Sequence, residues 1–287
     1  MLAGPSPEAL IGPIAAATGK IRVGSGGVML PHYSPFKVAE TFSLLAGLFP
    51  GRIDLGIGRA AGTDPLTTFA LQRDRRQAGV DDFPQQLAEL LGYLDGTLPE
   101  DHPFARLAAM LPGLPEQPEP WLLGSSQQSA LWAAELGLPY AFADFINAAG
   151  ADIAALYRER FAEHEHAGRH PRTAVAVWVI CAETDEEARR LAASGRMTFT
   201  LLRRGRLIAV PPPEDALRFL AAEERRSSGS RSERRAVVGS PATVRDELRE
   251  VVARYGAEEA IIVTITYEHE ARRRSYELLA EVFGQVG

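Results

Sequence analysis

Residues 21–59 constrain the fold most, because they combine two apolar segments with an unusual density of glycine. The pattern predicts a strand, a helix and a second strand, over residues 21–29, 36–48 and 52–57. Five glycines lie toward the carboxyl ends of the two strands: Gly24, Gly26, Gly27, Gly56 and Gly58. Glycine in a strand gives up packing and backbone entropy, so it typically marks the close approach of a backbone or a ligand. A ligand site is therefore expected at one end of a parallel sheet, where α/β folds place their ligands.

Apolar segments and amphipathic helices alternate along the whole chain. Six strands are expected, starting near Ile21, Arg52, Trp121, Tyr140, Ala174 and Ala260. Their apolar runs are continuous, which is typical of parallel strands covered on both faces. A doubly wound sheet and a (β/α)8 barrel short of two strands both fit this pattern. A Rossmann site is disfavoured, because no Gly-x-Gly-x-x-Gly motif opens a helix.

Composition excludes several classes of partner. The 287-residue chain has a net charge of -6, so it has no overall basic field for nucleic acid or an anionic membrane. No apolar run approaches the ~18–20 residues of a membrane span, and no signal peptide is visible, so we expect a cytoplasmic protein. The single cysteine, Cys181, excludes an internal disulfide and is expected in the core. Residues 225–235 are rich in Arg, Ser and Gly and contain no apolar residue, so we expect them to form a mobile loop.

Four motifs, in this order and spacing, resemble the bacterial luciferase-like flavin-dependent monooxygenases over nearly the whole chain. The motifs are Val-Gly-Ser-Gly-Gly-Val-Met-Leu-Pro-His-Tyr-Ser-Pro (23–35), Phe-Pro-Gly-Arg-Ile-Asp-Leu-Gly-Ile-Gly-Arg (49–59), Leu-Gly-Ser-Ser (123–126) with Leu-Gly-Leu-Pro-Tyr (136–140), and Val-Gly-Ser-Pro (238–241). The resemblance implies one domain over residues 1–287, a TIM (β/α)8-type barrel with FMN at the carboxyl ends of its strands. It also implies that the barrel is incomplete, because the family's first two strands, and the histidine motif that ends the second, have no counterpart here.

The resemblance assigns the flavin phosphate to two groups of residues. Arg59 would bind it through the planar fork of its guanidinium group. Gly124, Ser125, Ser126 and Ser129 would bind it at the start of a helix, where N–H groups and hydroxyls form an anion site. Ordinary capping by serine is the structural alternative, and a cap and a phosphate site can coexist.

The same resemblance places Ser25, Gly26 and Gly27 beneath the isoalloxazine ring. Related proteins have a cis peptide bond between non-proline residues here, so we expect a strained or cis bond at Gly26–Gly27. A simple strand bulge is an equally good interpretation of the two glycines.

No catalytic residue can be assigned. His32 and His269 each follow a strand at the expected ligand end and are weak candidates for acid–base work. His164, His166 and His170 lack the spacing of a zinc site and are expected on a solvated helix end. Ser25, Ser126 and Asp144 form no recognisable nucleophile triad.

The activity implied is oxygenation of an organic substrate by reduced FMN and O2, with the flavin reduced by a separate NAD(P)H:flavin reductase. The alternatives are an F420-dependent oxidoreductase and a flavin-binding protein without activity. The resemblance also implies a homodimer, formed through the helices over residues 7–18 and 36–48. Neither the substrate nor the choice between FMN and F420 follows from the sequence.

Overall fold

The computed structural model describes residues 6–59, 65–71, 82–164, 166, 168–226 and 236–284. The chain divides into two compact units, Met1–Gly124 and Ser125–Gly287. The predicted single domain stays a prediction. Most of the predicted mobile loop, residues 227–235, lies outside the described residues, and Arg225 belongs to a helix.

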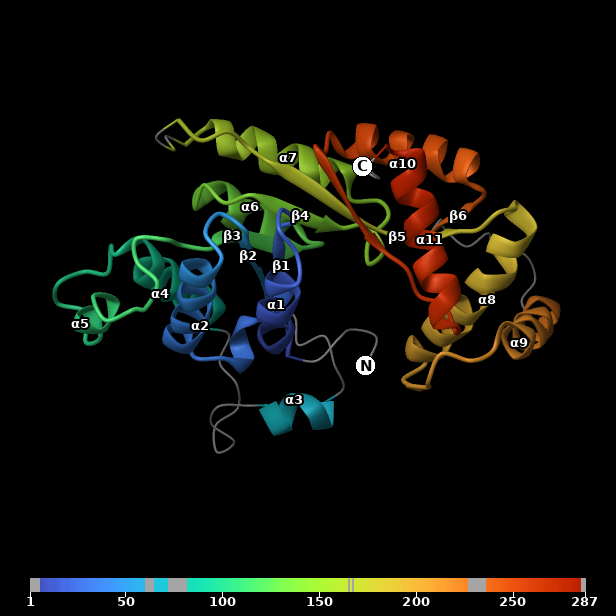
Figure 1. Ribbon diagram of the computed structural model, residues 1–287, viewed down its shortest axis with the longest axis horizontal. Coiled ribbons are helices and arrows are strands. Elements are labelled where there is room, and N and C mark those ends of the chain that lie inside the picture. The colour runs from blue at the N-terminus through green and yellow to red at the C-terminus, as the bar shows by residue number, and fades with distance from the viewer. Residues whose placement is uncertain are drawn as a thin grey trace. The chain divides into compact units, whose positions relative to one another are not determined.

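The first unit alternates helices with three strands (Figure 1). Its elements are α1 (Pro7–Ala16), β1 (Val23–Met29), the 3-10 helix η1 (Leu30–His32), α2 (Pro35–Leu48), β2 (Ile53–Gly58), α3 (Pro65–Leu71), α4 (Phe83–Asp95), α5 (Ala105–Ala108) and β3 (Glu119–Gly124).

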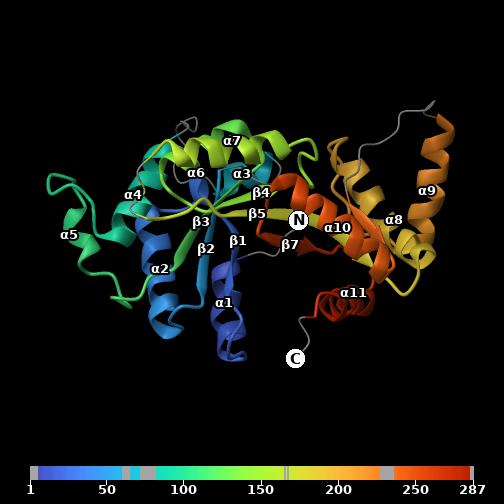
Figure 2. The same ribbon diagram turned by 90° about the horizontal axis from the view of Figure 1, so that it is seen from above.

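Strands β1, β2 and β3 form parallel neighbours in that order, and α1 packs beside β1 (Figure 2). In the register, Gly26 lies opposite Gly56, and Met29 lies opposite Gly58. Helix α2 buries Val38, Phe42 and Leu45, as its spacing predicts. This unit therefore brings the carboxyl ends of the two glycine-bearing strands to the same edge.

The second unit contains four strands and six helices among its described residues. Its elements are α6 (Gln127–Glu135), β4 (Tyr140–Ala143), α7 (Ala151–Ala162), β5 (Thr173–Cys181), α8 (Asp185–Leu202), α9 (Pro213–Arg226), β6 (Val237–Gly239), α10 (Pro241–Tyr255), β7 (Glu259–Val263) and α11 (His269–Val282).

Strand β5 is the centre of the second unit's sheet. It pairs in parallel with β4 near its start, with β7 over its first half and with β6 at its end. Seven of its nine residues are buried, with Val175, Val177 and Val179 on one face and Ala174 and Ile180 on the other, which accounts for its continuous apolar sequence. All these pairings are parallel, so the predicted α/β class with parallel strands is confirmed.

Three sequence-based expectations differ from the structure. Strand β6 was not expected, because three residues are too few to show a pattern. The spacing of Leu10, Ile11 and Ile14 predicts an apolar stripe on α1, but only Ile11 is buried, whereas Leu10 and Ile14 are exposed. The apolar run that starts at Ala260 predicts a strand as far as Tyr267, but β7 ends at Val263, four residues earlier.

None of the helices in the described ranges combines the length and apolar character needed to cross a bilayer.

Candidate functional site

The glycines of β1 and β2 fall into two groups when a Cβ atom is built on each. At Gly24 and Gly56 the added carbon would overlap backbone of the neighbouring strand, and at Gly27 it would lie 2.7 Å from the Gly56 carbonyl oxygen. At Gly26 it would meet no atom within 4 Å. The first three glycines are thus explained by strand packing, and Gly26 alone presents bare, exposed backbone to open space.

The backbone between these strands has both features that the sequence suggested. The Gly26–Gly27 peptide bond is cis, which confirms the predicted bond. The pairing with β2 also shifts register between Gly26 and Val28, as in a bulge. The cis peptide bond and the strand bulge are therefore two features of the same local structure at Gly26–Gly27.

Ser25 has a structural role that the sequence did not suggest. Its side chain is buried, and its hydroxyl group donates a hydrogen bond of 2.9 Å to the Gly56 carbonyl oxygen. This bond fastens β1 to β2 directly below the exposed Gly26 backbone.

Arg59 and His32 follow the carboxyl ends of β2 and β1, and Gly26 lies three residues before the end of β1. Arg59 is exposed and follows Gly58, the last residue of β2, and Gly58 is opposite Met29 at the end of β1. His32 closes η1, directly after β1. Its Nε2 atom is buried and has no hydrogen-bond partner among the described residues. A guanidinium group and an imidazole ring thus follow the carboxyl ends of these two strands, and the bare Gly26 backbone lies within β1.

The serines at the start of α6 form a capping box in the second unit. The Ser126 hydroxyl accepts from the Ser129 N–H at 3.3 Å, and the Ser129 hydroxyl accepts from the Ser126 N–H at 3.3 Å. This confirms the capping interpretation. Ser126 is exposed, whereas Ser129 is buried beneath it. Phosphate binding by Gly124, Ser125, Ser126 and Ser129 stays a prediction.

Sequence reasoning missed Tyr140, which supports this cap from below. Its hydroxyl lies 2.9 Å from the Ser129 Oγ atom, and the whole residue is buried at the start of β4. Burial raises the pKa of Tyr140 to about 12, and the hydrogen bond with Ser129 opposes that shift. The phenol is therefore protonated at neutral pH. The only local signal was a hydroxyl-bearing residue at the start of a buried strand.

The remaining polar candidates have other environments. His269 is exposed at the first position of α11. Asp144 is fully buried and accepts a hydrogen bond of 3.1 Å from the Tyr255 hydroxyl, which gives it a structural partner. Cys181 is buried as expected, and burial raises the pKa of its thiol to about 11.

The three-histidine segment is only partly solvated. His164 and His170 are exposed, but His166 is half-buried, with its Nε2 atom 2.7 Å from the Ala134 carbonyl oxygen. The expectation of a solvated face is therefore wrong for His166, because the end of α6 covers it. The described part of the chain has no cluster of side chains arranged to hold a metal.

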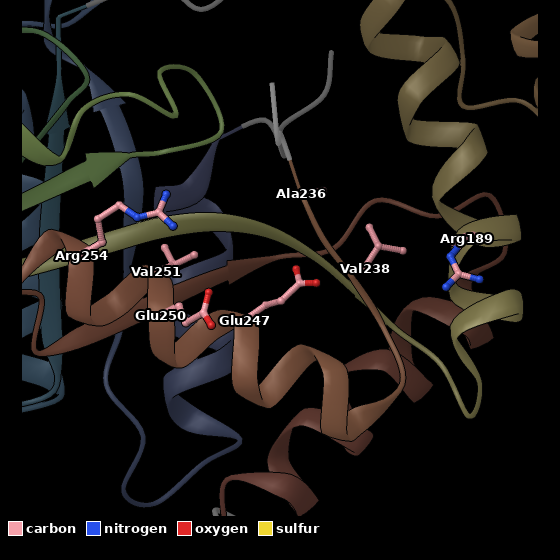
Figure 3. A pocket seen from close by; sticks show the side chains of 7 residues that line it. All are labelled: Arg189, Ala236, Val238, Glu247, Glu250, Val251 and Arg254. Carbon is pink, nitrogen blue, oxygen red and sulfur yellow. The ribbon is translucent and has the colours of Figure 1, made fainter. Parts of the chain in front are cut away.

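A separate groove of about 510 Å³ lies in the second unit between α8, β6 and α10 (Figure 3). Its lining residues are Arg189, Ala236, Val238, Glu247, Glu250, Val251 and Arg254. None of the residues predicted from the sequence to bind a ligand is among them. Its arginines and glutamates balance in charge, so the groove has no preference for an anion.

Comparison with known proteins identifies the family. A model of the luciferase-like monooxygenases matches residues 2–259. YwcH from Bacillus subtilis strain 168 is 46% identical, over 98% of this chain and 84% of that protein. A luciferase-like monooxygenase from Escherichia coli K12 is 36% identical, over 98% of this chain and 82% of that protein.

Solved structures agree with these sequence matches. The crystal structure of apo-MsnO8 is 42% identical, with a TM-score of 0.83, and covers 98% of this chain and 82% of that one. Two likenesses below 25% identity show the fold alone. They are the oxygenating constituent of 3,6-diketocamphane monooxygenase from Pseudomonas putida in complex with FMN (22%, TM-score 0.66, 98% and 84% covered) and the coenzyme F420-dependent tetrahydromethanopterin reductase from Methanopyrus kandleri (15%, TM-score 0.62, 98% and 88% covered).

The matched family model spans most of the chain, and relatives above 30% identity cover nearly all of it. The chain belongs to the luciferase-like monooxygenase family.

Proposed function

We propose that this chain is a flavin-dependent monooxygenase that uses reduced FMN and O2 to oxygenate an organic substrate. Membership of the family and the name of the Escherichia coli relative support the reaction class. Bound FMN would supply the redox chemistry, so the chain's own residues have to bind it, orient its ring and exclude water.

The observation that carries this proposal is that the bare backbone of Gly26 lies on β1 and that Arg59 follows the neighbouring strand β2, three residues beyond the register partner of Gly26. Gly26 offers an exposed backbone surface with no atom within 4 Å of an added Cβ, which suits a flat ring lying against it. Arg59 follows the adjacent strand and suits a phosphate dianion. In the second unit, Ser125 and Ser126 precede α6, and we propose that this helix start can also bind a phosphate group. Ser129 would act by holding Ser126 in place.

The phosphate assignment is tested by titrating FMN and riboflavin against the protein and following quenching of flavin fluorescence. Arg59→Ala should weaken FMN binding about 10- to 100-fold, because a charge-assisted hydrogen bond contributes roughly 1.5–3 kcal/mol. Riboflavin, which has no phosphate, should bind the wild type and the variant equally. Arg59→Lys should fall between them, since it keeps the charge and loses the fork.

The matched control is Arg106→Ala, which removes another exposed arginine of the same unit, in α5. It should leave both affinities unchanged. Equal losses of FMN and riboflavin in Arg59→Ala would contradict the phosphate assignment.

The cofactor and the activity need separate measurements. F420 is the competing cofactor, since an F420-dependent reductase shares the fold. Binding of F420 without FMN would replace the monooxygenase proposal by hydride transfer. If FMN binds but reduced FMN, regenerated by a separate NAD(P)H:flavin reductase, consumes O2 no differently than in buffer, the chain is a flavin-binding protein without activity.

A further inference from the structure

The groove between α8, β6 and α10 combines an apolar floor with charged walls (Figure 3). Val251 on α10 is 2% exposed, and Val238 on β6 packs against a buried apolar cluster of β5 and α8. Four charged side chains complete the lining: Arg189 from α8, and Glu247, Glu250 and Arg254 from α10. The volume of about 510 Å³ is typical of sites that bind a small organic molecule.

The charged residues of α10 form one stripe along the groove. Glu247, Val251 and Arg254 follow the i, i+4, i+7 spacing of a single helix face, and Glu250 lies beside Val251 on the same face. Arg254 lies at one end of the groove and Arg189 at the other, with the two glutamates between them (Figure 3). At 1.5 Å per residue, the seven residues from Glu247 to Arg254 span about 10 Å along the helix. The groove is therefore negative in its middle and positive at its ends.

Glu250 and Arg254 do not neutralise each other. A glutamate four residues before an arginine is the favourable order for an ion pair on a helix. Asp185 and Arg189 have this order on α8 and form an ion pair at 3.8 Å. The side chains of Glu250 and Arg254 are exposed, and neither makes an ion pair or hydrogen bond with another residue of the described ranges. Both charged groups are therefore available to a ligand.

This charge arrangement selects a ligand that carries both signs. A dianion would face Glu247 and Glu250, and a dication would face Arg254, so each would meet a like charge. Because Arg189 already has an acidic partner, Arg254 is the better site for a carboxylate. An ammonium group beside the glutamates, a carboxylate beside Arg254 and apolar groups between them match the lining. The ends of an extended dipeptide are about 7 Å apart, which fits within the stripe.

We propose that this groove binds a short apolar peptide with free termini, about the size of a dipeptide. Its ammonium group contacts Glu250, and its carboxylate contacts Arg254. Glu247 adds negative charge near the ammonium group, and the apolar side chains of the peptide lie on Val238 and Val251. This ligand site is separate from the residues assigned to FMN and does not depend on the proposed monooxygenase function.

NMR titration of the full chain, followed through its amide 1H–15N spectrum, tests the proposal with four probes. The probes are the dipeptide Val-Leu, its N-acetyl form, which lacks the ammonium group, its carboxyl-terminal amide, which lacks the carboxylate, and Gly-Gly, which lacks apolar side chains. Val-Leu should shift the signals of α10. It should bind about three- to fivefold more tightly than the N-acetyl form or the amide, as one exposed ion pair allows, and more tightly than Gly-Gly.

Two variants should each affect only the probes that carry the matching group. Glu250→Gln should weaken Val-Leu and its amide about three- to fivefold and leave the N-acetyl form unchanged. Arg254→Gln should weaken Val-Leu and the N-acetyl form by a similar factor and leave the amide unchanged. The matched control is Arg249→Gln, which removes an exposed arginine of α10 that does not line the groove. It should change no probe affinity.

Other results would overturn the inference. One is an amide that binds as tightly as Val-Leu. Another is an Arg254→Gln protein that loses the amide and Val-Leu equally. Displacement of Val-Leu by FMN would also count against it, because it would show that the groove takes anions. If the wild type does not bind FMN but the probe pattern holds, the peptide site stands and only the proposed monooxygenase function is overturned.

Discussion

Gly26 and Gly56 are opposite each other on β1 and β2, yet a methyl group has different consequences at the two positions. At Gly56 an added Cβ would overlap the Ser25 carbonyl oxygen, which is backbone and cannot rotate away. Gly56→Ala should therefore lower the free energy of unfolding by about 1–3 kcal/mol. At Gly26 the space is open, so Gly26→Ala should change the free energy of unfolding by less than about 0.5 kcal/mol.

For FMN affinity, unlike for stability, we expect Gly26→Ala to have the larger effect of the two substitutions. If the ring lies against Gly26, the extra methyl group should weaken FMN binding in Gly26→Ala by about 1–3 kcal/mol. Urea unfolding followed by circular dichroism and fluorescence titration with FMN give the two quantities. A Gly26→Ala protein with normal FMN affinity would show that the ring lies elsewhere.

Residue roles were predictable where the signal is local. The Gly26–Gly27 pair and the serine cap of α6 can be read from adjacent letters of the sequence. The inward position of Ser129 could not, because it depends on Tyr140, which is 11 residues away and on another element. The wrong expectation for His166 has the same cause, since its cover comes from the end of α6.

At the scale of elements, Asp185 connects two helices. It is the first residue of α8, and its Oδ1 atom accepts from the Ser240 N–H at 2.6 Å and the Thr243 hydroxyl at 3.0 Å at the start of α10. The hydrogen bond from the Ser240 N–H, followed by those from the Thr243 and Ser240 hydroxyls, holds the pKa of Asp185 below its ordinary value.

This shift predicts a pH-dependent contribution to stability. A carboxyl group with a lowered pKa in the folded state stabilises the protein above its unfolded pKa of about 3.9, and this contribution is lost as the pH falls through the folded pKa. Asp185→Asn should therefore be less stable than the wild type at pH 7, and the difference should shrink below about pH 4. Urea unfolding at pH 7, 5 and 3 measures it.

Asp152→Asn provides the comparison, because Asp152 is an exposed acid in the first turn of α7. It should show a smaller difference at pH 7. A stability difference for Asp185→Asn that does not change with pH would contradict the role of the charged carboxylate.

Elements were predictable in proportion to their length. Strand β5 has nine residues, of which seven are buried, whereas β6 has only three residues and pairs with the end of β5. Periodicity placed the apolar face of α2 correctly. For α1 it identified an apolar stripe but could not say which element covers it, and within this chain Leu10 and Ile14 have little cover.

At the scale of the molecule, alternation of apolar strands with helices predicted a parallel α/β protein, and each unit has that structure. The choice between a doubly wound sheet and a barrel required the family resemblance. In both folds the strands are covered on both faces, so both give the same continuous apolar runs in the sequence. The incomplete (β/α)8 barrel is supported by the likeness to apo-MsnO8 and otherwise stays a prediction.

The exposed apolar residues of α1 and α2 predict a homodimer. Leu10 and Ile14 on α1 and Leu44 and Leu48 on α2 are 44–62% exposed, and the two helices are in contact, so we expect these side chains to contribute to one apolar surface. Light scattering at micromolar concentration should give twice the chain mass of 31.1 kDa for the wild type. The double variant Leu44→Glu with Leu48→Glu should give a monomer, because a self-complementary interface would place each new charge near its own copy.

The control is Leu217→Glu, which changes a similarly exposed leucine on α9. This variant should remain a dimer. A monomeric wild type, or dissociation by Leu217→Glu alone, would mean that this surface does not join two copies.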